Sequence, residues 1–92
     1  VIVMGDLNDF QWSNPLMTLQ GKELSNLIVT LPANEQYTYI YEGNGQVLDH
    51  ILVSNQLLSK FASIEIVHLN SEYYYMDRLG DHDPVVAIFD LN

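Results

Sequence analysis

Three short strings in the sequence combine carboxylates with an amide or an imidazole: Gly5-Asp6-Leu7-Asn8, Leu48-Asp49-His50-Ile51 and Asp81-His82-Asp83-Pro84. Each string places a carboxylate at or beside the end of a run of residues that predicts a β-strand. Carboxylates, an amide and an imidazole gathered from separate strand ends can hold a divalent cation and a phosphate group together. The three strings therefore indicate a site for metal-assisted phosphate cleavage.

Asp6 and Asn8 are two residues apart in the first string. In an extended backbone such residues point to the same side and lie about 6–7 Å apart. An acid and an amide that project together can bind a water molecule and a phosphate oxygen at once. The structural alternative is an Asx-type turn or a helix cap.

Asp49 shares one face of its predicted strand with Ile51 and Val53. A carboxylate in an apolar row is costly unless it is paired or hydrogen-bonded. His82, from another strand end, is the best candidate partner, because a carboxylate on one ring nitrogen fixes the tautomer and raises the basicity of the other. The alternative is a structural acid that accepts backbone N–H groups from a loop.

Asp81, His82 and Asp83 follow one another directly before Pro84. Adjacent side chains of an extended chain face opposite ways, so one can hold a metal while the next addresses a phosphate. Proline biases the preceding residue away from the helical region and directs the chain into the last strand. For His82 alone, the alternative is a hydrogen-bonded turn histidine.

Other residues that could contact a ligand also have a structural interpretation. His50 and His68 lie in apolar strands, where packed, satisfied histidines are expected rather than metal ligands. The tyrosines at 37, 39 and 41 share one strand face, where packing competes with stacking on a base. Phe10 and Trp12 follow the first string and are expected either to line a substrate groove or to fill the core. Trp12 and Tyr39 are taken as candidate substrate-binding residues.

The pattern of apolar residues and turn signals predicts an α+β domain over residues 1–92, with about five strands in one mixed or antiparallel sheet and two or three short helices. Residues 1–5 predict a strand buried on both faces. Asn14 as N-cap, followed by Pro15 at the first helical position, predicts a helix that ends at Gly21. The segments 37–42 and 47–54 predict a hairpin around Gly43-Asn44-Gly45. Further strands are expected at 63–69 and 85–91 and a helical turn at 55–60, whereas 23–31 is ambiguous between a helix and an irregular segment.

The composition narrows the possible functions. The net charge is −9, with Lys22, Lys60 and Arg78 the only basic residues, which argues against nucleic-acid binding by electrostatics alone. Bound divalent cations could neutralise part of the acidic charge. The sequence has no cysteine, no apolar run of about 20 residues and no signal peptide, and it opens directly on an apolar strand. We therefore expect no membrane span, and we expect the natural polypeptide to continue upstream.

Taken in order, the first string, the segment Val47–Ser54 and the segment Gly80–Val85 resemble the C-terminal half of the endonuclease/exonuclease/phosphatase superfamily, the fold of DNase I and of exonuclease III-type apurinic endonucleases. The resemblance covers essentially the whole chain. The longer strings Gly5–Leu16 and Tyr37–Asp49 are similar to the branch that contains secreted bacterial nucleases. Gly80 is a departure, since family members usually have serine before the Asp-His pair.

This resemblance implies half of a four-layer DNase I-like α/β sandwich and a metal-dependent phosphodiesterase acting on nucleic acid, DNA above all. The cofactor would be Mg²⁺, with Mn²⁺ or Ca²⁺ as alternatives, and the location would be extracellular or periplasmic. The implied roles are activation of water by Asp6, phosphate binding by Asn8, orientation of His82 by Asp49, transition-state stabilisation by His82 and metal binding by Asp81.

The resemblance also implies that an N-terminal half, which carries the principal metal-binding glutamate and a second sheet, is absent. The 92 residues alone are therefore expected to be inactive. A phosphomonoesterase, or an inositol or lipid phosphatase, of the same fold is the alternative among enzymes. A non-catalytic half-domain that self-associates through its uncovered sheet face is the alternative from another class.

Overall fold

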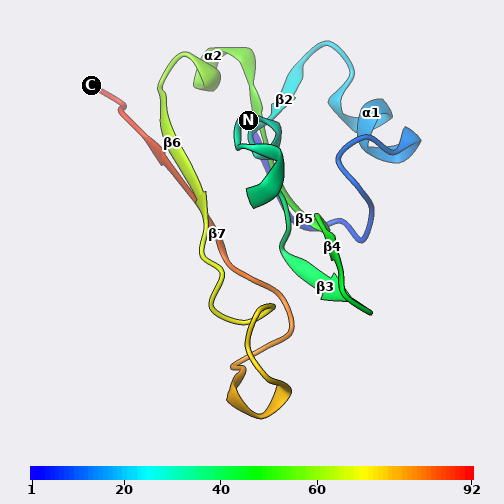
Figure 1. Cartoon of the computed structure of the whole chain (residues 1–92). Coiled ribbons are helices and arrows are strands. Elements are labelled where there is room, and N and C mark those ends of the chain that lie inside the picture. Colours follow the sequence, from blue (N-terminus) through cyan, green and yellow to red (C-terminus); the bar gives the residue numbers. More distant parts are fainter.

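Strand β5 (Asp49–Ser54) is the centre of the largest sheet in this computed structural model, which describes the backbone of residues 1–92 and every side chain except that of residue 75. It pairs antiparallel with β2 (Leu24–Asn26) on one side (Figure 1) and with β1 (Ile2–Asp6) on the other. Leu52 and Val53 are fully buried. Because successive side chains of a strand face opposite ways, β5 is covered on both faces, as its continuous apolar run requires.

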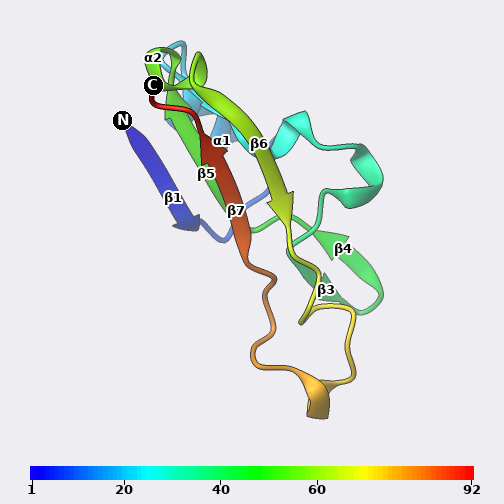
Figure 2. The same ribbon diagram turned by 90° about the vertical axis from the view of Figure 1, so that its left-hand side faces the viewer.

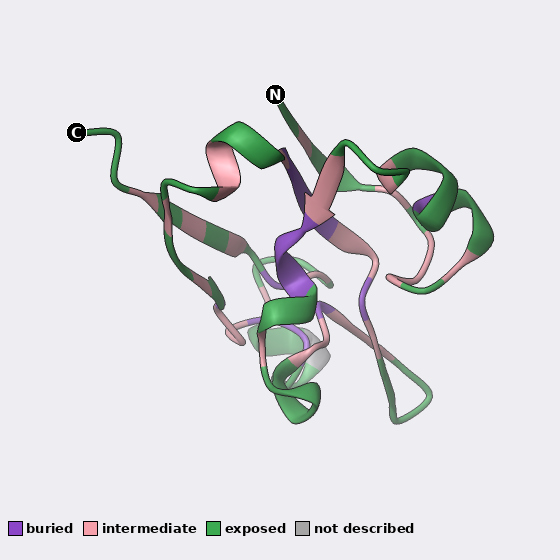
Figure 3. Cartoon of the chain, turned by 90° about the horizontal axis from the view of Figure 1, so that it is seen from above, coloured by how far each residue is buried: buried purple, intermediate pink, exposed green. Residues whose placement is uncertain are grey.

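A second antiparallel pair, β6 (Phe61–Ile66) and β7 (Val85–Phe89), packs against this sheet. One core cluster joins Leu27, Ile51 and Val53 to partly buried residues of the second pair (Phe61, Ile64, Val85, Ala87 and Phe89). Figure 3 shows that burial concentrates on β5 and on the segment directly after β2, where Leu27 and Ile28 are fully buried. Along β7, half-buried and exposed residues alternate. The core therefore lies between the three-stranded sheet and the β6–β7 pair.

The helices are short. α1 (Asn14–Gln20) begins after Ser13, whose hydroxyl accepts the N–H of Leu16, and it ends at Gly21, whose φ of 50° favours glycine. This helix was predicted, but Ser13 rather than Asn14 is its cap. The remaining helical segments are α2 (Asn55–Leu58) and the 3₁₀ turns η1 (Leu27–Thr30), η2 (Ala33–Glu35) and η3 (Tyr75–Asp77). Residues 23–31, ambiguous from sequence, form β2 and η1.

The predicted hairpin between 37–42 and 47–54 is wrong. β3 (Tyr39–Tyr41) pairs instead with β4 (Asn44–Gln46), and Glu42 and Gly43 form a two-residue loop with φ values of 49° and 82°. Positive φ at both loop positions gives a turn whose twist matches that of the strands, so the chain reverses before the expected position. β5 is thereby free to pair with β1 and β2.

The α+β class is confirmed, but the expectation of about five strands in one sheet is wrong: across the described backbone there are seven strands in three small sheets. The expectation that residues 1–5 form a strand buried on both faces is also wrong. β1 is an edge strand, with Ile2 49% and Met4 70% exposed. In Figure 2 β1 and β7 run along the same face, and an apolar groove lined by Ile2, Met4, Ile51, Val85 and Phe89 lies there.

No helix in the described part of the chain is both long enough and apolar enough to cross a membrane.

Candidate active site

Asp49 and His82 form a hydrogen-bonded pair. Asp49 is the first residue of β5, and its Oδ2 lies 2.6 Å from Nδ1 of His82, which comes from the loop before β7. Both side chains are about three-quarters buried. Burial alone would lower the pKa of His82, but the hydrogen bond to Asp49 and the charges of Asp49, Asp6 and Asp81 outweigh it, so this pKa is raised. The pairing leaves Nε2 as the nitrogen that can act on a substrate.

Asp6 faces Asp49 directly across β1 and β5. In the same register the N–H of Leu7 donates to the carbonyl of Leu48, so Leu7 and Leu48 form a hydrogen-bonded pair. Because hydrogen-bonded and non-hydrogen-bonded pairs alternate along antiparallel strands, Asp6 and Asp49 form a non-hydrogen-bonded pair, in which side chains approach most closely. One ligand atom each from Asp6, Asp49 and His82 lies within 4.8 Å of the others. The structure thus brings together three of the five residues expected at the site.

Asn8 does not extend the strand beyond Asp6. Its φ is 54°, and its N–H donates to Oδ1 of Asp6 at 2.9 Å. The expected extended geometry of Asp6 and Asn8 is therefore wrong, and the Asx-type turn that was its alternative is present. Asn8 remains exposed, in the loop that leaves the strand end carrying Asp6.

His50 is hydrogen-bonded to this loop. It is 1% exposed, its Nδ1 lies 3.0 Å from the amide nitrogen of Asn26, and its Nε2 lies 2.7 Å from the carbonyl oxygen of Asp9. Because an amide nitrogen can only donate, Nδ1 is the acceptor and Nε2–H donates to Asp9. The prediction of a packed, satisfied histidine at position 50 is confirmed.

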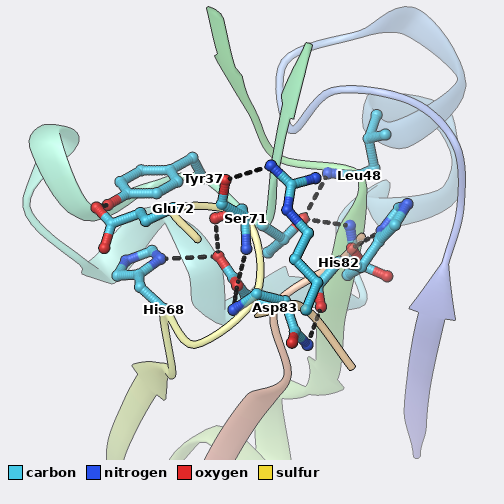
Figure 4. A network of polar contacts seen from close by, with 11 residues as sticks. Tyr37, Leu48, His68, Ser71, Glu72, His82 and Asp83 are labelled. Atoms are coloured by element: carbon cyan, nitrogen blue, oxygen red, sulfur yellow. Dashed lines mark hydrogen bonds and ion pairs between the residues drawn. The ribbon is translucent and has the colours of Figure 1, made fainter. Parts of the chain in front are cut away.

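The loop that carries His82 is held by the neighbouring carboxylate of Asp83. This side chain accepts the backbone N–H groups of Asn70 and Ser71, the hydroxyl of Ser71 and Nδ1–H of His68, and we call these four residues the Asp83 network (Figure 4). Burial would raise the pKa of Asp83, but these hydrogen bonds outweigh it and lower it. Asn70 also donates its side-chain amide to the carbonyl of His82 at 2.8 Å. Asp83 therefore has a structural role: it supports the loop that carries His82. This role was not predicted from the sequence.

The prediction for His68 is confirmed in its packing, since the ring of Tyr37 stacks on it with centroids 3.9 Å apart, but not in its hydrogen bonding. Its Nε2 is buried, with no hydrogen-bond partner among the described atoms. Tyr37 in turn bonds Glu72, and burial together with this hydrogen bond and the charge of Glu72 raises the pKa of Tyr37 to about 12. Tyr37 and Glu72 thus contact the Asp83 network through His68.

Tyr39 stacks on His82, with ring centroids 5.0 Å apart and 28° between the planes. Trp12 is 69% exposed and lies against Phe10, with centroids 5.0 Å apart. The core-filling alternative is therefore excluded for Trp12. Of the two candidate substrate-binding residues, the structure brings Tyr39 to the Asp49–His82 pair, whereas Trp12 lies on the loop beyond Asn8.

Comparison with protein-family models matches residues 1–82 to the endonuclease/exonuclease/phosphatase family. The chain belongs to this family. Comparison with curated proteins and with solved structures gives no significant match. Membership assigns the chain to a superfamily of phosphodiesterase- and phosphatase-type hydrolases, whose members generally use divalent metals.

The donor atoms of this family member are of the kind that a hard cation prefers, but they are few. Carboxylate oxygens suit Mg²⁺, which keeps several waters and takes one or two carboxylates from a protein. Oδ2 of Asp49 is already bonded to His82 and Oδ1 of Asp6 to Asn8, so each carboxylate has one further oxygen to offer. The residues therefore fit a largely hydrated ion with few protein ligands.

Asp81 lies outside the group formed by Asp6, Asp49 and His82. It is exposed and lines a hollow with Arg78 and Leu79, although its charge contributes to the raised pKa of His82. Arg78 stabilises the preceding loop by donating to the carbonyls of Ser71 and Tyr73. The metal-binding role expected for Asp81 stays a prediction.

Proposed function

We propose that this chain is the C-terminal part of a divalent-metal-dependent phosphodiesterase that cleaves nucleic acid, DNA above all, by an activated water. The observation that carries the proposal is the Asp49–His82 pair beside Asp6. In a hydrolase family, this arrangement offers an oriented imidazole and a second carboxylate at the place where a phosphate would lie.

Each residue has a distinct part in the proposed reaction. Asp6 accepts the proton of the attacking water, and Asn8 donates its side-chain amide to a phosphate oxygen. Nε2–H of His82 stabilises the negative charge that develops on the pentacovalent phosphate, while Asp49 keeps the proton of Nδ1 in place. A bound Mg²⁺, near Asp81 and the free carboxylate oxygens, would supply charge neutralisation and ease departure of the leaving oxygen.

We further propose that the 92 residues work together with an N-terminal half of the same domain and are inactive alone. Two observations support this. The described donor group contains only two carboxylates and one imidazole. The edge strands β1 and β7 expose Met4, Val86 and Ile88, which a second layer of structure would cover.

The test compares the isolated chain with the complete polypeptide that includes it. Hydrolysis of plasmid DNA, bis-(p-nitrophenyl) phosphate and p-nitrophenyl phosphate is measured with Mg²⁺ and with EDTA. We expect the complete polypeptide to cleave the two diesters in Mg²⁺ only, His82→Gln to lose about 10²–10⁴-fold in rate, and the distant Asp90→Asn to stay active. Preference for the monoester would establish a phosphatase instead, and robust cleavage by the isolated chain would disprove the need for a second half.

A further inference from the structure

Thr38 bonds to both segments that carry the Asp49–His82 pair. It is fully buried, and its hydroxyl accepts the backbone N–H groups of Leu48 at 3.1 Å and Asp49 at 3.3 Å. Its carbonyl accepts the N–H of Asp83, directly after His82, at 2.7 Å. Thr38 thus contacts both Asp49 and Asp83, the residue next to His82.

The sheet explains why Asp49 needs this hydroxyl. Asp49 and Asp6 form a non-hydrogen-bonded pair, so the N–H of Asp49 points away from β1. On its other side β5 pairs with β2 only from Leu52 to Ser54, and β2 does not reach Asp49. Even a partly buried N–H without a partner is costly, and Thr38 supplies the acceptor that a strand would have supplied.

We propose that Thr38 is a positioning residue of the active site: its hydroxyl sets the position of Asp49, and its carbonyl sets that of the loop carrying His82. The inference rests on the proposed function, since it assumes that the Asp49–His82 pair does chemistry. It goes further by assigning the alignment of that pair to a residue that touches neither substrate nor imidazole. A displacement of Asp49 that lengthens its 2.6 Å bond to His82 beyond about 3.2 Å would weaken that bond.

The experiment uses NMR of the 92-residue chain labelled with ¹⁵N, without metal or substrate. Thr38→Val keeps the shape and removes the hydroxyl, whereas Thr38→Ser restores it. Thr30→Val is the matched control, because the hydroxyl of Thr30 also bonds a backbone group, the carbonyl of Leu27, but in η1 away from the pair. The ring-nitrogen signals of His82 are assigned by their loss in His82→Gln.

Above the pKa of His82, we expect wild type, Thr38→Ser and Thr30→Val to show a single neutral tautomer with the proton on Nδ1. Thr38→Val is expected to populate both tautomers, and its Asp49 amide is expected to exchange with solvent about tenfold faster, as for one lost hydrogen bond. Unchanged His82 signals in Thr38→Val would overturn the proposal. So would a Thr38→Ser variant that behaves like Thr38→Val, because the methyl group and not the hydroxyl would then matter.

If Thr38→Val does not fold, Thr38→Ala takes its place, since it removes the hydroxyl without placing a second methyl group against the N–H groups of Leu48 and Asp49. An altered tautomer in Thr38→Ala with a normal one in Thr38→Ser supports the proposal, and two normal spectra overturn it. These spectra require no turnover. Failure of the hydrolase assay and failure of the role of Thr38 therefore give separate results.

Discussion

The carboxylates of Asp6 and Asp49 face each other across the non-hydrogen-bonded position at the ends of β1 and β5. Like charges directly opposite one another destabilise a strand pair. Nδ1 of His82 offsets part of this repulsion at Asp49, and Asn8 donates its N–H to Asp6. A cation bound between the two carboxylates would relieve the repulsion that remains.

The first prediction concerns Asp6→Asn. The amide keeps an oxygen for the N–H of Asn8 and removes one of the two opposed charges, so we expect stability without divalent metal to rise by roughly 0.5 kcal/mol. Addition of Mg²⁺ should raise the midpoint of thermal unfolding of the wild type more than that of the variant. Urea and thermal unfolding, with EDTA or with Mg²⁺, measure both effects.

The matched control for that prediction is Asp90→Asn. The carboxylate of Asp90 also accepts the N–H of the residue two positions on, Asn92, but the neighbour of Asp90 across the strands is Lys60, to whose carbonyl its own N–H donates. It should change neither the stability nor the response to Mg²⁺. A wild type that does not respond to Mg²⁺ would contradict a cation site between Asp6 and Asp49 in this chain.

The pairing of Asp49 with His82 could be predicted from the sequence because it depends on residue types alone. A carboxylate in the row with Ile51 and Val53 needed a partner, and few residues offered one. Thr38 and Asp83 could not be assigned as supports in the same way. Their role depends on which backbone groups the sheet leaves unpaired, and that follows from strand register rather than from residue type.

The register was the part of the fold that the sequence left open. Gly43-Asn44-Gly45 offered several turn positions, and the choice of Glu42 and Gly43 decided that β4 is a separate short strand. β5 then pairs with two strands distant in sequence, and such non-local pairings leave no local pattern. The exposure of Met4 likewise could not be read from an apolar run, because edge and central strands can have the same composition.

The second prediction concerns the pH dependence that Asp49 gives to His82. The raised pKa of His82 means that the pair stabilises the fold fully below the unfolded value of 6.5, and that this stability is lost as pH rises through the folded pKa. In Asp49→Asn the pKa of His82 should fall, and the loss of stability should be larger in mild acid than in alkali. NMR titration of His82 and urea unfolding at both pH values check this, and a stability loss independent of pH would contradict it.

The third prediction concerns Asp83→Asn. The carboxylate accepts four hydrogen bonds, and an amide must turn its NH₂ group toward some of these donors, so we expect a loss of about 1–3 kcal/mol at neutral pH. Because the pKa of Asp83 is lowered, its contribution is present above the unfolded value of 3.8 and is lost as pH falls through the folded pKa. The difference between wild type and variant should therefore shrink in acid. Urea unfolding over a pH series measures it, and a constant difference would show that the charge is not involved.

The fourth prediction concerns Trp12, the single tryptophan of the chain. Its indole is 69% exposed on the loop after Asn8, where a base next to a bound phosphate could stack on it. A short single-stranded oligonucleotide, added with Mg²⁺ to offset the net charge of −9, should quench tryptophan fluorescence. By calorimetry, Trp12→Ala should weaken binding by about 1–3 kcal/mol, the contribution of one stacked base. Leu19→Ala, which trims an exposed side chain of α1, should bind normally. If the oligonucleotide binds without changing the fluorescence, Trp12 does not belong to the substrate surface, and the stacking platform must be sought at Tyr39.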